Sequence, residues 1–320
     1  LTVGNHMTAA LWALVQAGLF VAAAPLLLGW VKWLKCLLQN RAAPPLRQPY
    51  RDLARLFRKQ PVLAKNASWL FRFTPYGVFG ATVAAAALVP LLTLATPGAQ
   101  LGDIIVLVGL LALGRTFTAL AGMDIGTAFG GMGASREMAV SAFTEPAMLM
   151  AIFTLTMTAA STNLASAITH ILDQGFILRP SFTFALLGLM MVAVAETSRI
   201  PVDNPATHLE LTMLHEAMVL EYSGRHLAIL DWAAHIKFMI FAVLIIDLFL
   251  PWGIAADLSA GAMAIAIAAL LLKLTMLAIT LVAAETVLAK MRLFRVPEYL
   301  NLAFLLSLLG LLSHVILEVA

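Results

Sequence analysis

The sequence is poor in cysteine and in charge. Its 320 residues include one cysteine, Cys36, which excludes an intramolecular disulfide and any zinc or iron–sulfur centre held by several thiolates. Asp, Glu, Lys and Arg make up 12% of the chain, about half of the roughly 25% typical of soluble domains. Internal repeats and Walker A, G-x-G-x-x-G and G-x-S-x-G patterns are also missing. These shortages argue against an ordinary soluble enzyme.

Hydrophobic residues are abundant instead, at 62% of the chain with a mean hydropathy of +0.94. A helix needs ~20 apolar residues to cross the ~30 Å hydrocarbon core of a bilayer. Apolar runs of about this length lie at about 8–31, 74–95, 103–122, 138–160, 182–198, 236–252, 260–288 and 299–318. The first run is longer than the ~7–15 residues of a signal-peptide core, so no cleavable signal peptide is expected. The sequence predicts an all-α integral membrane protein of about eight transmembrane helices, forming one membrane domain over 1–320, with a loop at Gly126–Gly133.

Basic residues set the predicted orientation. The connector 32–73 contains half of the 20 Lys and Arg residues and a single acid, Asp52. Cytoplasmic loops of membrane proteins carry such a basic excess, so this connector, and with it 115–137, 199–237 and 289–298, is expected in the cytoplasm. Both termini are then outside it, and the protein is expected in the bacterial cytoplasmic (inner) membrane. The same rule accounts for the net charge of +3, so no nucleic-acid partner is expected.

One segment of the basic connector has a helical pattern without being long enough to span. In Tyr50–Gln60, Leu53, Leu56 and Phe57 share one side, and basic residues surround the other. This pattern is typical of an amphipathic helix on the membrane surface. The connectors 32–73 and 199–235, which are long for a membrane protein, are interpreted as docking loops.

Ionisable residues inside the spans are candidate functional groups, because each costs ~2.5–3.5 kcal/mol at a helix centre on insertion scales. Glu145 lies directly before Pro146, whose ring crowds the carbonyl of Ala142 and removes one backbone donor. A kink with a free carbonyl beside a carboxylate can hold water and pass protons. A neutral Glu145 hydrogen-bonded between helices is the structural alternative.

Other charges in or near the spans are open to both interpretations. Glu137 is expected to pair with Arg136 or Arg115, and Asp124 fits an ion pair or a helix end. Three more residues are candidates for a proton path or for structural ion pairs: Lys273 in the middle of its span, Asp247 as its neighbour or as a group touching headgroup water, and Glu285 near the inner end of a span.

The segment from Ala195 to Asp231 is the densest group of titratable residues. Neighbouring carboxylates raise one another's pKa, and histidines titrate near neutrality, so the segment is a candidate proton relay. Its acids and histidines are Glu196, Asp203, Glu210, Glu216, Glu221, Asp231, His208, His215 and His226. Val219 stands where the zinc motif H-E-x-x-H needs its second histidine, so no metal site is predicted. Arg225 is interpreted as a docking residue or a plain surface charge.

Four separated motifs carry a resemblance to a known family. They are AETSRIPVD followed by LEYSG, GMDIGTAFGGMGASREMAVSAFTEPAMLM, RQPYRDLARLFRKQ and AETVLAKMRL. The first pair resembles the signature of subunit 1 of complex I and of its relatives in membrane-bound group 4 [NiFe] hydrogenases. The others are closer to the hydrogenase branch, that is, formate hydrogenlyase subunit 4 and hydrogenase-4 component C. The likeness covers most of the chain.

The resemblance implies particular roles for residues. It matches Glu145 to the membrane glutamate of the fourth span; Glu196, Arg199 and Asp203 to the start of the family's acidic loop; and Glu210 and Glu221 to later loop acids. His215 and Glu216 belong to a local variant. Ala206 and His208 stand where relatives usually carry acids, so the proton route is expected to differ in detail.

The resemblance also implies a function: a non-catalytic membrane anchor that docks the soluble electron-transfer arm and couples it to proton or cation translocation. The expected partners are hydrogenase-like large and small subunits, antiporter-like membrane subunits and the lipid membrane. The chain itself is expected to bind no cofactor, and the [NiFe] centre and iron–sulfur clusters are expected in the partners. Two alternatives stay open: the quinone-site subunit of an NADH:quinone-type oxidoreductase, and a stand-alone secondary transporter.

Overall fold

The computed structural model describes residues 3–94, 102–174, 179–203, 214–255, 259–292 and 295–318. Within these ranges every regular element is a helix, and the only β-type pairings are isolated bridges. Six helices are long and apolar enough to cross a membrane: α1 (Val3–Leu38), α4 (Ile104–Asp124), α5 (Ala128–Thr156), α9 (Gly224–Phe249), α10 (Ala260–Val287) and α11 (Val296–Ser313). The predicted all-α membrane fold is confirmed.

The two remaining predicted spans also fall on helices. The fifth corresponds to α7 (Pro180–Glu196), which is apolar but shorter than the six. The second corresponds to α3 (Trp69–Leu88), which begins earlier than predicted because Ser68 caps it: its side chain accepts a hydrogen bond from the Leu70 backbone N–H. Short helical segments η2 (Met157–Ala159) and η6 (His314–Glu318) follow α5 and α11.

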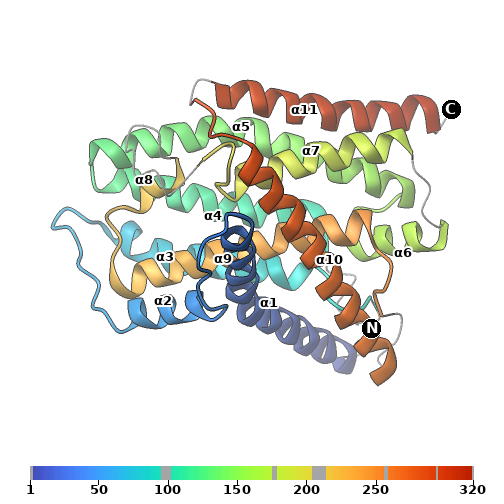
Figure 1. The fold of residues 1–320 in the computed structure, drawn as a ribbon, viewed down its shortest axis with the longest axis horizontal. Helices are drawn as coiled ribbons and strands as arrows, with labels where there is room; N and C mark the ends of the chain where they lie inside the picture. The colour runs from blue at the N-terminus through green and yellow to red at the C-terminus, as the bar shows by residue number, and fades with distance from the viewer. Residues whose placement is uncertain are drawn as a thin grey trace.

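The helices give the molecule two distinct ends. α2 (Gln48–Phe57) and α8 (His215–Val219) lie at one end, and α6 (Leu164–Gln174) lies at the other (Figure 1). The start of α1 and the end of α11 are at the α6 end, opposite the basic connector (Figure 1). This arrangement fits the predicted even number of crossings. The placement of the two ends relative to the cytoplasm stays a prediction.

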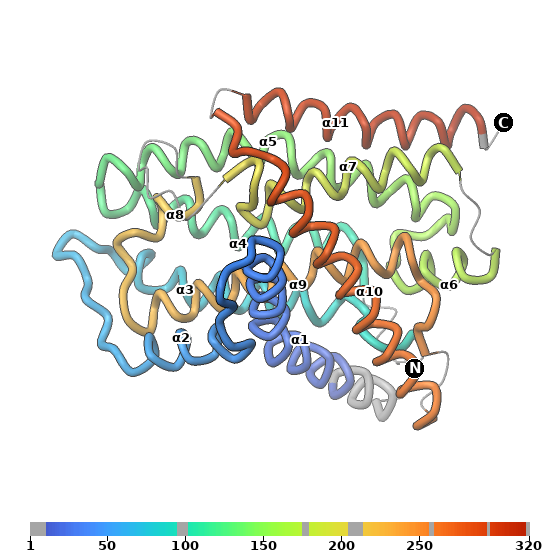
Figure 2. Tube along the Cα trace, viewed as in Figure 1, coloured from blue at the N-terminus to red at the C-terminus, as the bar shows by residue number. Residues whose placement is uncertain are grey.

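Helix α9 forms the centre of the bundle, with 61% of its most apolar stretch buried, against 28% in α1, α10 and α11. It contacts α1, α2, α3 and α7. In Figure 2, α1 and α10 slant across the other helices, whereas α7 and α11 run side by side and are in contact. The outer helices present exposed apolar side chains such as Leu271, Leu272 and Met276, as expected where lipid is the solvent.

The predicted loop at Gly126–Gly133 is wrong, because α5 already begins at Ala128. The side chain of Thr127 caps this start by accepting a hydrogen bond from the Gly130 N–H. The glycines serve close packing instead: a Cβ at Gly133 would come within 2.8 Å of the Ala217 Cβ in α8. Small residues of this kind let neighbouring helices approach each other in membranes.

The amphipathic helix is confirmed as α2. Leu53 is buried, and the ring of Phe57 meets Trp232 of α9 edge-on at 6.0 Å. Arg51 and Arg55 are exposed. The apolar side therefore packs on the bundle, and the basic side faces outward.

Gly188 lies where α7 packs against α11, so a substitution there tests this contact. A Cβ there would collide with the Ser307 side chain and come within 3.1 Å of the Ser307 backbone nitrogen. We expect Gly188→Ala to lower the free energy of unfolding by about 1–3 kcal/mol, measured as the thermal midpoint in detergent. Gly80→Ala is the matched control, because no atom lies within 4 Å of its added Cβ. Equal midpoints for the two variants would contradict the tight α7–α11 contact.

Candidate functional site

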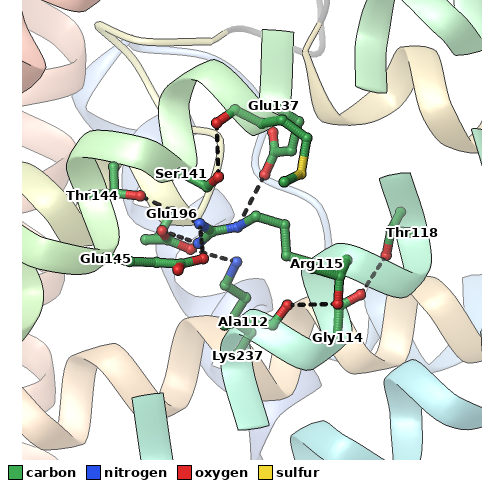
Figure 3. A network of polar contacts seen from close by, with 12 residues as sticks. Ala112, Gly114, Arg115, Thr118, Glu137, Ser141, Thr144, Glu145, Glu196 and Lys237 are labelled. Atoms are coloured by element: carbon green, nitrogen blue, oxygen red, sulfur yellow. Dashed lines mark hydrogen bonds and ion pairs between the residues drawn. The ribbon is translucent and has the colours of Figure 1, made fainter. Parts of the chain in front are cut away.

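A buried arginine on α4 forms ion pairs with three carboxylates from two other helices. The Arg115 side chain is 3% exposed. Its Nη1 lies 2.9 Å from Glu145 Oε1, its Nε lies 3.5 Å from Glu137 Oε1, and its Nη2 contacts Glu196 Oε1 directly (Figure 3). Glu137 and Glu145 belong to α5, and Glu196 ends α7. The predicted pairing of Glu137 with Arg115 is confirmed.

A lysine from the central helix completes the group. Lys237 of α9 places its Nζ 2.7 Å from Glu196 Oε2 (Figure 3). We call Arg115, Glu137, Glu145, Glu196 and Lys237 the Arg115 cluster. It joins four helices and contains two cations and three carboxylates, so fully ionised it has one excess negative charge. Burial penalises an uncompensated charge, and the two cations offset most of the charge of the three carboxylates.

The three carboxylates differ in their access to the surroundings. The side chain of Glu145 is 34% exposed, against 13% for Glu137 and 1% for Glu196. Helix α5 continues through Pro146, and Thr144 beside it accepts a hydrogen bond of 3.4 Å from Arg115 Nη1. Glu145 is thus the most accessible carboxylate of the cluster.

Two cavities that share lining residues lie next to the cluster. One of about 100 Å³ borders Arg115, Glu196 and Lys237. The other, of about 620 Å³, contains titratable residues from several elements. Five residues line both cavities, among them His215 and Ser198. The titratable groups of the larger cavity are Lys32, Lys35, Arg199, Asp203, His215, Glu216, Tyr222, Asp231, His235 and Glu285.

Glu285 forms a second buried ion-pair site. Its Oε2 lies 2.6 Å from Lys35 Nζ of α1, and its Oε1 lies 2.9 Å from Arg199 Nη1. The Arg199 guanidinium also lies over the Phe238 ring, 4.0 Å from the centroid. Burial lowers the pKa of Arg199 and the Glu285 carboxylate opposes that effect. The site ties the segment after α7 to α1 and α10.

Asp203 makes a structural contact of a similar kind. It is 1% exposed, and its Oδ2 accepts a hydrogen bond of 3.2 Å from the Leu214 backbone N–H. Its Oδ1 lies 3.3 Å from Lys290 Nζ, after the end of α10. Asp203 therefore connects the residues that precede α8 with the connector that follows α10.

The remaining predicted residues are not in the Arg115 cluster. Asp124 is at the end of α4 and accepts a 2.9 Å hydrogen bond from the Ser68 N–H, as the helix-end interpretation requires. Asp247 and Lys273 are buried elsewhere in the bundle. Arg136 is half-buried on α5, whereas Glu221 and Arg225 are exposed. Glu210 and His208 lie outside the described residues.

Sequence reasoning missed the position of Lys237. The sequence predicts that span six begins at 236 and places Lys237 at the end of the cytoplasmic connector 199–237. Helix α9 begins at Gly224, which places Lys237 well inside a helix. The signal was the apolar periodicity of residues 227–234, which the histidines and acids of that segment obscured.

His215, which lines the large cavity, makes a pH-dependent contribution to the free energy of unfolding of the protein. Burial lowers the pKa of His215, with Glu137 opposing. The unfolded chain therefore binds this proton more readily, with a histidine pKa of about 6.5. The contribution is complete above that pH and is lost as the pH falls through the lower pKa of the folded state. We expect His215→Gln to lose less thermal stability than the parent between about pH 7 and about pH 5. Parallel midpoint–pH curves would contradict this.

The fold and the cluster define a multi-pass membrane protein with a buried ion-pair network that reaches a polar cavity. The family model described as NADH dehydrogenase matches residues 10–315. The chain belongs to this family, as its motifs predicted.

Two relatives match along almost the whole chain. Formate hydrogenlyase subunit 4 of Escherichia coli (strain K12) is 30% identical over 303 residues, covering 95% of this chain and 98% of the relative. Hydrogenase-4 component C of the same organism is 32% identical over 300 residues, covering 94% of each. A chain of the membrane-bound sulfane sulfur reductase, an archaeal respiratory membrane complex, has the same fold, with a TM-score of 0.79 at 16% identity; the match covers 95% of this chain and 99% of that one.

Proposed function

We propose that the chain is the membrane-anchor subunit of a complex I-like group 4 [NiFe] hydrogenase assembly of the formate hydrogenlyase or hydrogenase-4 type, located in the bacterial inner membrane. The observation that carries the proposal is the match over 94–95% of the chain to membrane-complex subunits of those two systems. The protein binds no redox centre itself. The [NiFe] centre and the iron–sulfur clusters belong to its partners.

The end of the molecule with α2 and α8 is the proposed docking side for the large and small hydrogenase-like subunits. There the connector 32–73 exposes basic residues on α2, and the large cavity presents acids and histidines. Charged surfaces of this kind steer and orient a partner. The apolar outer faces of the outlying helices are left for antiporter-like membrane subunits and lipid.

The Arg115 cluster is the proposed coupling element. Its excess negative charge favours binding a proton, Glu145 is its accessible carboxylate, and His215 links its cavity to the docking side. A redox event in the docked arm would change the charge or position of groups around the large cavity, and that change would shift the proton affinity of the cluster.

A mild-detergent pull-down of the tagged chain, followed by metal analysis, tests membership in the complex. We expect nickel and iron to co-purify, together with antiporter-like membrane subunits. A tagged, unrelated multi-pass protein purified in parallel is the control. Partners without nickel would contradict the hydrogenase assignment, and recovery of the chain alone in active form would instead favour a stand-alone transporter.

A quinone site is the second candidate function, because the structure contains an apolar cavity beside the polar one. The apolar cavity, of about 240 Å³, lies between α1, α7, α9 and α10, with Phe238 and Phe241 in its wall. Val31 and Thr197 line both it and the large polar cavity, as a site for an apolar tail and a polar head group would require. Inhibition of electron transfer by a quinone analogue, relieved by Phe241→Trp, would support it. Absence of inhibition at any concentration would exclude it.

A further inference from the structure

A second pair of buried charges lies outside the Arg115 cluster. Asp247 of α9 is 1% exposed and Lys273 of α10 is 3% exposed. Among the described residues, no ion pair within 4.0 Å joins them, and Asp247 Oδ2 is buried without a hydrogen-bond partner. The carboxylate and the ammonium lie close enough to act on each other electrostatically. The pair is therefore loosely coupled, and its carboxylate is incompletely satisfied.

The pair is separated from the Arg115 cluster by an apolar stretch. Asp247 follows Lys237 on α9 by ten residues, about 15 Å along the helix axis. The nine residues between them, 238–246, are all apolar, and eight of them are buried. The two sites therefore lie at different depths of the bundle, and Asp247 is near the end of α9 that leads to the predicted outer face.

A tryptophan covers the lysine on that side. The Lys273 Nζ lies 4.7 Å from the centroid of the Trp252 ring, and Trp252 is 46% exposed. The turn that contains Trp252 is fixed on both sides. The Ala255 N–H donates to the Leu92 carbonyl at 2.9 Å, and a Cβ at Gly253 would come within 2.6 Å of the Ala269 Cβ, one turn before Lys273 on α10.

We propose that Asp247 is a proton-binding site that exchanges with the outer side of the membrane, with Lys273 as its counter-charge and Trp252 as the cover between the site and the outer surface. One proton adds to the free carboxylate oxygen to form the acid, while Lys273 keeps its ammonium form, and the same proton later leaves to outer water. A buried, unpartnered carboxylate favours the neutral acid, and a nearby ammonium favours the ionised form. Their opposition makes the proton exchangeable, and a cation over an aromatic face holds Lys273 in place.

Infrared pH-difference spectroscopy on inverted membrane vesicles containing the complex tests this site directly. The lumen of these vesicles corresponds to the outer side, and the pH on the two sides is set independently. We expect a carboxylic-acid C=O band that follows the lumen pH, is absent in Asp247→Asn and moves in frequency in Asp247→Glu. The last variant also keeps the test valid if Asp247→Asn does not fold. Asp173→Asn, an exposed acid of α6, should leave the band unchanged.

Two further variants separate a proton site from a structural ion pair. Lys273→Met should keep Asp247 protonated, so that the band no longer responds to pH. Trp252→Ala should speed the response to a lumen pH jump severalfold, and Trp252→Phe should restore the parent rate. A band that follows the cytoplasmic pH, or the absence of any band that depends on Asp247, would overturn the proposal. Neither result would bear on whether the chain assembles with hydrogenase-like partners.

Discussion

Replacing Arg115 by methionine is expected to destabilise the protein more than any other single change in the site. Arg115 contacts Glu137, Glu145 and Glu196, and without it the remaining cation of the cluster is Lys237, which pairs with Glu196. Removing one partner of a buried ion pair costs about 3–5 kcal/mol. We expect little Arg115→Met protein in a monodisperse peak after extraction in mild detergent, and a greatly lowered thermal midpoint for what remains.

Matched variants distinguish this effect from general loss of a cation. Arg58→Met changes an exposed arginine after α2 and should leave the midpoint nearly unchanged. Arg115→Lys should be intermediate, because an ammonium cannot bind several carboxylates through a planar fork. Adding Glu196→Gln to Arg115→Met should recover part of the stability, since it reduces the excess negative charge of the cluster from two to one. Strict additivity of the two changes would contradict a shared network.

Much of the fold could be predicted from the sequence because the membrane limits the solutions. Long apolar runs must be helices in lipid, and the six long helices follow from that rule. Acids inside such runs are costly, so Glu145 and Glu137 could be singled out without a structure. The amphipathic pattern of 50–60 similarly predicted α2.

The partners of these acids could not be predicted as easily. Arg115 and Glu196 are 81 residues apart in sequence, and a helix that is apolar on all sides carries no pattern that says which side faces which neighbour. The position of Lys237 could not be predicted because α9 begins earlier than the sequence indicates. Gly130 and Gly133 look like loop residues unless the contacts with α4 and α8 are known. In each case the missing information was the rotation or the length of a helix.

Glu145→Gln is the second variant with a large expected effect, on coupling rather than on folding. Glutamine still accepts a hydrogen bond from Arg115, and the 34% exposure of this side chain leaves room for the amide. The cluster then has two cations and two carboxylates, so no excess negative charge remains to favour protonation. The complex should assemble and transfer electrons normally, whereas proton translocation should fall about tenfold or more, as for loss of a positioned proton-transfer group.

The most direct test is to measure electron transfer and vesicle acidification on the same preparation of the reconstituted complex, for the parent, Glu145→Gln and the exposed control Glu298→Gln. Hydrogen uptake with a viologen dye reports the electron transfer, and a pH-sensitive dye reports the protons. The account predicts unchanged hydrogen uptake in all three and acidification lost only in Glu145→Gln. Full electron transfer together with full acidification in Glu145→Gln would contradict a role of the Arg115 cluster in coupling.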